Sequence, residues 1–313
     1  MIRSVRACAR ALAVLAVVFL ALTAAPRADT APQTLTFGQD WTNTALISSD
    51  NNWSGVPGII GYRGDGMVGS TGVDPQTVLA DGSATPVSVL ANQTNPNTLT
   101  TGGVAEFHLA NPVVALQGSG TARAPHIVIS VSTAGLSTIQ VSYTLRDVDG
   151  SGDNAVQPVA LQYRAGSSGP YTNVPAGFVA DATSGPSLAT LVTPVNVTLP
   201  AAAENQPLVQ IRILTTDAAG SDEWVGIDDI NISGSSIPQP TNPTGIGSAT
   251  PSSVTAGNST LLTVAVTPGQ NETSTGLTVT GDLSSIGINA PQPFFDDGTN
   301  TRMLRFASFA FVD

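Results

Sequence analysis

Apolar and polar residues alternate along most of this chain with the two-residue period of β-strands. Residues 138–147 show this most clearly, because apolar residues occupy the odd positions from 139 to 145 and polar residues occupy the even positions between them. Since successive side chains of a strand point to opposite faces of a sheet, this segment is predicted to be a strand with one buried face. Strand-like stretches are found at 34–37, 104–109, 113–117, 126–131, 138–147, 156–164, 189–199, 208–215 and 224–232.

Nine strands within about 200 residues, separated by turn-forming residues, predict an all-β fold of the jelly-roll β-sandwich type over residues 33–234. Helical periodicity is almost absent from this region. The stretch 64–103 is rich in Gly, Thr, Asn and Asp, and it is expected to form a long loop. Loops of this length in compact domains are usually functional or mobile.

A second module is predicted after a polar, proline-containing linker at 235–245. Residues 246–313 have the strand pattern of an immunoglobulin-like β-sandwich, which normally takes about 100 residues and seven strands. Because fewer residues are present and 301–313 abandon the preceding pattern, we expect this Ig-like module to be incomplete and the chain to be truncated. We also expect 301–313 to find no partner strand.

The N-terminus has the layout of a secretory signal peptide over residues 1–28. Three arginines within the first ten residues precede an apolar run at 11–22, and small residues with Pro26 follow it. The run is shorter than the roughly 20 residues that cross a bilayer, although an uncleaved anchor is the alternative. We therefore predict a secreted, extracellular protein with no membrane span after signal cleavage.

Composition narrows the chemistry of the mature chain. Its only cysteine, Cys8, lies inside the predicted signal peptide, which leaves no thiol for a disulfide or a thiolate metal site. The formal net charge is -11 and no lysine occurs, so removal of the four arginines of residues 1–28 makes the charge -15. Such acidity disfavours nucleic acid, whose binding depends on clustered basic residues, and it leaves carboxylates available for calcium.

No arrangement of residues indicates a catalytic centre. The nucleophile elbow, the zinc-protease motif and the phosphate-binding glycine loop are all absent from the sequence. His108 and His126 are the only histidines, and both lie within predicted strands, where a structural imidazole is the ordinary role. We expect this chain not to be an enzyme.

Three segments resemble a known kind of module. The sequence GIIGYRGD at 58–65, together with 144–164 and 223–232, is similar to a jelly-roll module near the N-terminus of secreted bacterial multidomain proteins. Those proteins include extracellular nucleases of the endonuclease/exonuclease/phosphatase type. The segment GIDDI at 226–230 also looks like the last strand of MAM-type and galactose-binding-like sandwiches, and 243–298 resembles a bacterial Ig-like repeat.

The resemblance leaves three functions open. The first is a secreted, non-catalytic binding or structural module that is stabilised by calcium and recognises a polysaccharide or another cell-surface ligand. The second is the N-terminal fragment of an extracellular nuclease or phosphoesterase whose catalytic domain is missing. The third is a surface adhesion protein that uses Ig-like repeats as spacers.

Asp147, Asp149 and Asp153 are the first candidates for metal binding. They lie on a glycine-containing turn, and oxygen ligands of this kind suit calcium. The spacing is not that of an EF-hand, because Ser151 and Pro158 stand where that loop has ligands. Ordinary turn chemistry of Asp-Gly is the alternative reading.

Asp228 and Asp229 are the second candidates. Strand alternation puts one of the two carboxylates toward the packed side unless a bulge intervenes, and a buried carboxylate needs a partner. The resemblance to MAM-like and carbohydrate-binding sandwiches implies a calcium site that Asp40 or Glu223 would complete. Pairing with an arginine such as Arg63 or Arg212 is equally compatible with the sequence.

Trp53 is the candidate for ligand binding. It lies in the polar segment 49–55, and an exposed indole combines an apolar face with a polar edge, as sugar stacking requires. The alternative is that its ring covers an edge of the core.

Overall fold

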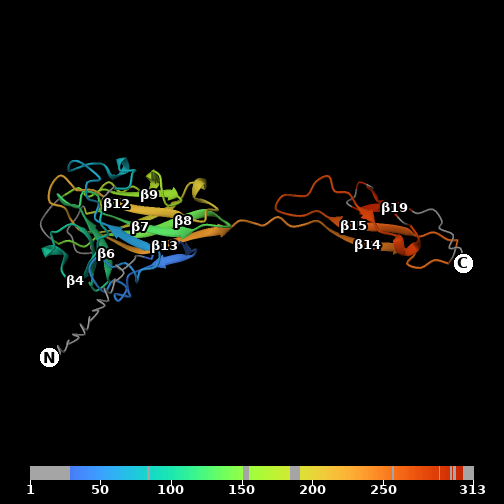
Figure 1. Cartoon of the computed structure of the whole chain (residues 1–313), viewed down its shortest axis with the longest axis horizontal. Helices are drawn as coiled ribbons and strands as arrows, with labels where there is room; N and C mark the ends of the chain where they lie inside the picture. Colours follow the sequence, from blue (N-terminus) through green and yellow to red (C-terminus); the bar gives the residue numbers. More distant parts are fainter. Residues whose placement is uncertain are drawn as a thin grey trace, which may run out of the picture. The chain divides into compact units, whose positions relative to one another are not determined.

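The structure of the protein is a computed structural model that describes residues 29–82, 85–150, 155–183, 191–255, 257–288, 290–296, 298 and 301–305. The chain divides into two compact units, Met1–Ser236 and Ile237–Asp313, which we call unit 1 and unit 2 (Figure 1). Within the described residues, no helix has the length and apolar character needed to span a membrane.

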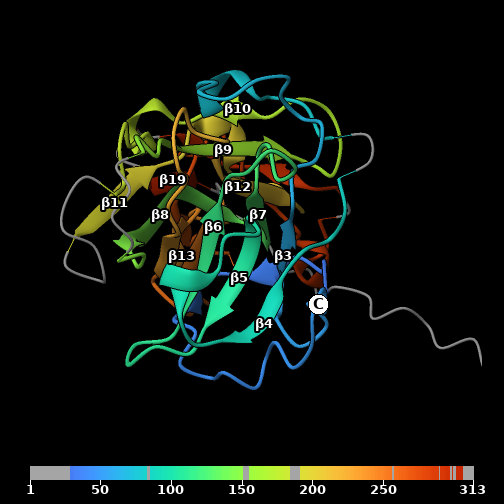
Figure 2. The ribbon, with the colours of Figure 1, turned by 90° about the vertical axis from the view of Figure 1, so that its left-hand side faces the viewer.

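Unit 1 is built from two β-sheets. The six-stranded sheet has the order β1-β7-β12-β9-β10, with β3 also paired to β7. Its strands are β1 (Gln33–Thr34), β3 (Ile59–Tyr62), β7 (His126–Ser132), β9 (Val159–Ala165), β10 (Thr172–Asn173) and β12 (Val209–Thr215). Figure 2 views unit 1 from its end, with β9 and β10 at the top of the view and β4 and β5 toward the bottom.

The seven-stranded sheet has the order β11-β8-β13-β6-β5-β4, with β2 also paired to β13. Its strands are β2 (Phe37–Gln39), β4 (Leu90–Gln93), β5 (Gly103–Phe107), β6 (Val113–Gln117), β8 (Leu136–Asp147), β11 (Val192–Thr198) and β13 (Val225–Ser236). From β7 to β13 the chain passes from one sheet to the other at nearly every connection. This alternation confirms the predicted all-β jelly-roll β-sandwich.

The core of unit 1 lies between the sheets and follows the predicted alternation. On β8 the side chains of residues 139, 141, 143 and 145 are all buried, and on β12 the same is true of Ile211 and Ile213. Trp41 and Trp53 meet edge to face within this core, with ring centroids 6.4 Å apart. Gly61 on β3 has no side chain because a Cβ there would overlap the ring of Trp53.

The expectation that the segment 64–103 forms a long loop needs correction. The segment contains strand β4 and two 3-10 turns, η1 (Pro75–Thr77) and η2 (Pro96–Thr98), so it is not loop throughout. β4 pairs in parallel with β5, an arrangement that local sequence does not reveal. The 3-10 turns η3 (Pro175–Gly177) and η4 (Ala201–Ala203) complete unit 1.

Unit 2 has a four-stranded sheet of order β14-β15-β19-β18 and a two-stranded sheet of β16 and β17. The bounds are β14 (Thr244–Thr250), β15 (Leu261–Thr267), β16 (Thr280–Gly281), β17 (Gln292–Pro293), β18 (Phe295–Asp296) and β19 (Thr301–Arg305), with the 3-10 turn η5 (Ser284–Ile286). β19 pairs with β15 from Leu261↔Arg305 to Ala265↔Thr301. The expectation that 301–313 lacks a partner strand is therefore wrong for 301–305, while 306–313 lies outside the described residues.

Candidate functional site

The outer face of the six-stranded sheet carries polar residues that are nevertheless buried. Because the apolar residues of β7, β9 and β12 point into the core, the alternate positions face outward. His126, Gln162, Arg164 and Arg212 occupy such outward positions and are all buried. Polar side chains on an outer face are buried only when another part of the chain covers them.

The covering segment is residues 64–82, which we call the strap; it crosses the sheet face beside β9 and β10 (Figure 2). Arg212 donates hydrogen bonds to the carbonyl oxygens of Val78 and of Ala80, the latter at 3.1 Å. Gln162 Nε2 donates to the carbonyl oxygens of Val78 at 3.2 Å and of Pro75 at 3.3 Å. Buried polar side chains of the sheet therefore hold the main chain of the strap in place.

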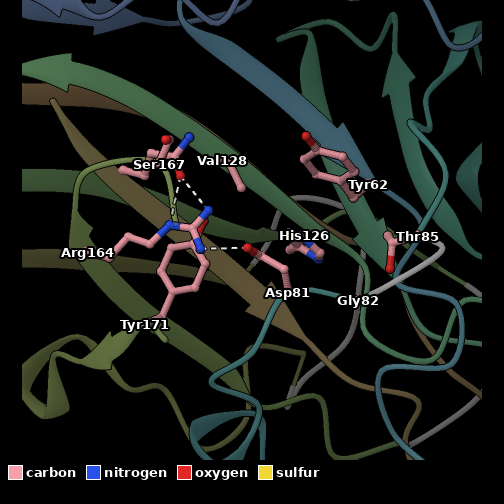
Figure 3. A pocket seen from close by; sticks show the side chains of 10 residues that line it. Tyr62, Asp81, Gly82, Thr85, His126, Val128, Arg164, Ser167 and Tyr171 are labelled. Carbon is pink, nitrogen blue, oxygen red and sulfur yellow. Dashed lines mark hydrogen bonds and ion pairs between the residues drawn. The ribbon is translucent and has the colours of Figure 1, made fainter. Parts of the chain in front are cut away.

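A hollow of about 270 Å³ opens on the sheet where the strap ends (Figure 3). Strands of the sheet supply its floor, the strap and Thr85 supply one wall, and the 165–171 turn supplies another. The lining residues are Tyr62, Asp81, Gly82, Thr85, His126, Val128, Arg164, Ser167, Tyr171 and Gln210.

Arg164 organises the charged side of the hollow. Its Nη1 donates to Asp81 Oδ2 at 2.6 Å and to the Gly169 carbonyl oxygen at 2.9 Å. Its Nε and Nη2 both donate to Gln210 Oε1, at 2.8 and 2.6 Å. Four of the five N–H groups of the guanidinium are thus engaged, and Arg164 fixes the positions of both Asp81 and Gln210.

Asp81 remains accessible although it is paired. Its side chain is 52% exposed, and its second oxygen, Oδ1, accepts no hydrogen bond from the described residues. Gln210 accepts through Oε1, which leaves its Nε2 amide group as a donor. The hollow therefore presents one fixed carboxylate acceptor and one fixed amide donor.

Tyr62 and His126 form the aromatic part of the hollow. Their rings stack with centroids 5.2 Å apart and an interplanar angle of 26°. His126 Nδ1 lies 2.8 Å from the Ala124 carbonyl oxygen, and burial, reinforced by the charge of Arg212, lowers the pKa of His126 to about 3. The ring is consequently neutral at physiological pH, with the proton on Nδ1 and an acceptor lone pair on Nε2.

The lining favours a neutral ligand with several hydroxyl groups. The carboxylate of Asp81 and His126 Nε2 accept hydrogen bonds, the amide of Gln210 donates, and the hydroxyls of Tyr62, Thr85 and Ser167 do either. No hydrogen bond between the described residues joins His126 Nε2 to a hydroxyl group.

Trp53 does not contribute to this site. Its side chain is 1% exposed, and its Nε1 donates to the Ser88 carbonyl oxygen at 3.1 Å inside the core. The prediction of an exposed, sugar-stacking indole is therefore wrong, and the alternative of a core residue holds. Polar neighbours such as Asn52 and Ser54 satisfy each other locally and say nothing about the direction of the ring.

Asp228 and Asp229 are separated by a β-bulge of β13, at which Asp229 adopts a φ of 50°. The buried carboxylate of Asp228 accepts from Arg146 Nη1 at 2.7 Å and from Asn111 Nδ2 at 2.9 Å. This is the arginine pairing left open by the sequence, with Arg146 in place of Arg63 or Arg212. Asp229 is exposed instead.

Asp229 shares a shallow hollow of about 350 Å³ with Asp40, the co-ligand proposed for it. Two hydrogen bonds from Thr42 lower the pKa of Asp40. Among the residues that the structure describes, these two carboxylates are not joined by a third acidic residue or histidine into a group suited to a metal ion.

Asp147 and Asp149 are both buried near the end of β8, where the Asp149 amide donates to Asp147 Oδ1 at 3.3 Å. Asp149 lines a polar hollow together with Asp222. Asp153, the third predicted ligand, lies outside the described residues. In the described part of the chain this region likewise contains no group of three metal-binding side chains.

The lining residues were not among those predicted from the sequence, apart from His126, which was interpreted as a structural imidazole. The available signal was the occurrence of Gln162, Arg164, Gln210 and Arg212 at outward strand positions, where two glutamine-arginine pairs face each other across β9 and β12. Sequence alone does not show that Asp81 and Tyr171 come back to meet them.

Comparison with known proteins gives no family. No protein-family model matches the chain, and no curated protein matches it. A non-crystalline-cellulose-specific carbohydrate-binding module of family 28 is similar to it in structure with 11% identity and a TM-score of 0.32, over 48% of this chain and 99% of that one. A family 61 module in complex with β-1,4-galactotriose has 13% identity and a TM-score of 0.26, over 41% of this chain and 74% of that one.

A cyclase from Fischerella sp. is similar to the same degree, with 13% identity and a TM-score of 0.32 over 58% of this chain and 87% of that one. Binding modules and an enzyme thus appear at equal similarity. These values identify neither a family nor a ligand for this protein.

Proposed function

We propose that unit 1 is a non-catalytic binding module of a secreted protein and that its hollow binds a neutral saccharide of a polysaccharide or cell-surface glycan. The observation that carries the proposal is the combination of an aromatic residue, Tyr62, with Asp81 and Gln210, which Arg164 holds in fixed positions. Carbohydrates offer apolar C–H faces to aromatic rings and hydroxyl groups to polar side chains, and both are provided here.

Charge supports a neutral rather than an acidic ligand. The cation of Arg164 is already paired, and the exposed oxygen of Asp81 would repel a carboxylate or a phosphate. The formal net charge of -11 adds a long-range repulsion against polyanions, which include nucleic acids. The hollow therefore selects hydroxyl-rich ligands without charge.

The proposed export of the protein, and the proposed place of unit 1 beside other domains, rest on the sequence. The signal-peptide pattern at 1–28 supports export, and the resemblance to modules of secreted multidomain proteins supports a targeting role for unit 1 beside other domains. No residue of the hollow favours the nuclease or phosphoesterase alternative. Structural calcium at the predicted aspartates belongs to the same proposal.

Isothermal titration of the full chain with neutral oligosaccharides of glucose, galactose, mannose, xylose and N-acetylglucosamine tests the proposal. We expect at least one of these series to bind and Tyr62→Ala to weaken it at least tenfold, while Tyr62→Phe keeps most of the affinity because the ring remains. Val192→Ala is the matched control, since this side chain is 48% exposed on β11 of the other sheet. Absence of binding in every series, or equal affinities for Tyr62→Ala and the control, would contradict the proposal.

A further inference from the structure

The hollow is enclosed on several sides, and this limits which part of a glycan enters it. Resting on the proposed function, we infer that the ligand is the terminal residue of a neutral glycan chain, bound end-on, and not an internal stretch of the chain. The inference comes from the walls of the hollow, its size and the direction of its hydrogen bonds.

The strap blocks the sheet face on one side of the hollow. Val78 of the strap packs with Ala124 and Leu214 into a small apolar cluster on the outer face of the sheet. Next to this cluster, Arg212 and Gln162 are completely buried beneath the strap. A linear chain that followed the strands across this face would collide with the strap directly beyond the hollow.

Two further walls flank the hollow across the strands. Tyr171 and Ser167 come from the turn between β9 and β10, and Tyr62 stands on β3 beyond β7 (Figure 3). The Tyr171 amide donates to the Leu79 carbonyl oxygen at 2.8 Å, which joins the turn to the strap. The walls support one another, so opening the hollow into a long groove would break several buried hydrogen bonds.

The volume sets the size of the bound unit. At about 270 Å³ the hollow lies just below the range of about 300–1,000 Å³ that drug-sized ligands occupy. A space of this size accommodates one sugar ring, or two at most. A segment of four to six residues would leave most of its length outside.

Hydrogen-bond direction distinguishes a chain end from an internal residue. Asp81 Oδ1 and His126 Nε2 only accept, so a ligand must bring hydroxyl protons to both. A terminal residue has a free hydroxyl where an internal residue has a glycosidic oxygen, and that oxygen has no proton to donate. Each glycosidic oxygen takes away one hydroxyl proton, so an internal residue has fewer donors to offer these two acceptors than a terminal residue has.

The experiment uses the full chain and the oligosaccharide series that binds it in the titrations above. We expect affinity to level off at one or two sugar units, with less than a threefold gain from the dimer to the hexamer. Binding capacity per gram of the parent polysaccharide should rise in proportion to the number of ends when the polymer is cut into shorter chains.

Asp81→Asn sharpens the test because the amide retains an oxygen but adds a donor. We expect this variant to bind the monosaccharide at least tenfold more weakly than the wild-type chain. Its melting temperature is measured to confirm that it folds. A tenfold or larger gain from dimer to hexamer for the wild-type chain, or capacity that does not depend on the number of ends, would overturn the inference while leaving saccharide binding intact. Failure of every saccharide to bind would overturn the proposed function and the inference together.

Discussion

The guanidinium carbon of Arg212 lies 3.9 Å from the centroid of the Tyr171 ring, and Arg164 lies 4.2 Å from the same ring. A cation placed over an aromatic face is attracted by the negative charge density of the ring, most strongly where water is excluded. Burial raises the pKa of Tyr171 to about 12, so the ring remains a neutral phenol between the two cations. This contact joins the floor of the hollow to one of its walls.

Replacement of Arg212 should destabilise unit 1 strongly. Arg212→Ala removes one of the two cations that stack on Tyr171, and it removes the donors to the Ala80 carbonyl oxygen and to the buried Gln162 Oε1 and one of two donors to the Val78 carbonyl oxygen. We expect a loss of about 3 kcal/mol in the free energy of unfolding. Arg63→Ala is the control, because its ion pair with Asp65 is partly exposed and contributes less than about 1 kcal/mol. Urea unfolding measures both, and equal losses would show that the strap is not held by Arg212.

Replacement of Trp53 should affect stability and not ligand contact. Trp53→Ala empties a core site beside Trp41 and Gly61, and such truncations cost about 3–5 kcal/mol. Trp53→Phe fills part of the space and should lose less. Thermal unfolding measures the difference, and an unchanged melting temperature for Trp53→Ala would contradict the buried position of the indole.

Asp222 should make stability depend on pH. Burial, together with the neighbouring Asp217, raises the pKa of Asp222 to about 7 from an ordinary value of 3.8. The folded state then holds a proton that the unfolded state has lost, so stability from this group is fully present below about pH 4 and is lost as the pH rises toward 7.

Asp222→Asn should remove this contribution. The amide keeps the oxygen that accepts from the Ala218 amide at 2.8 Å, and it carries no charge at any pH. We therefore expect the variant to gain stability relative to wild type as the pH increases from 5 to 8. Parallel unfolding midpoints for the two proteins across this range would rule the prediction out.

Calcium binding stays a prediction from the sequence. If a carboxylate site forms, chelator should lower the melting temperature by a few degrees, because extracellular sites bind at roughly 0.1–1 mM and a tenfold excess of ligand adds about 1.4 kcal/mol. Asp149→Asn or Asp229→Asn should abolish the difference at whichever region holds the ion. Identical melting curves with and without chelator, on protein freed of metal, would refute it.

The fold was predictable because strand alternation is a local signal. The periodic segment 138–147 became β8 and the segment 208–215 became β12, each within two residues of the expected bounds. β3 and β4 were missed, since each has only four residues and β3 gains its stability from β7, a partner that is distant in sequence. The arginine that pairs with Asp228 could not be predicted either. Strand alternation predicts which face of the sheet a side chain occupies, but it does not predict which residue the side chain contacts.

Unlike the fold, the candidate site could not be predicted from the sequence. Tyr62, Asp81, Arg164 and Gln210 come from four separate segments, and the resemblance that includes Tyr62 and Arg164 assigns neither of them a role in binding. Their meeting depends on the strap crossing the sheet, which in turn depends on buried hydrogen bonds of Arg212. Trp53 was predicted to bind ligand because the polarity of its sequence neighbours was the only available guide to its exposure.

Saccharide binding is proposed for the hollow bounded by Tyr62, Asp81 and Gln210. Its most direct test is nuclear magnetic resonance of the full chain during titration with glucose, galactose, mannose, xylose, N-acetylglucosamine and cellobiose. If saccharide binds there, at least one sugar should cause saturable shifts of the Tyr62 and His126 ring signals and of the Gln210 side-chain amide. Shifts confined to the Asp40 and Asp229 surface, or no saturable shift with any of the sugars, would contradict it.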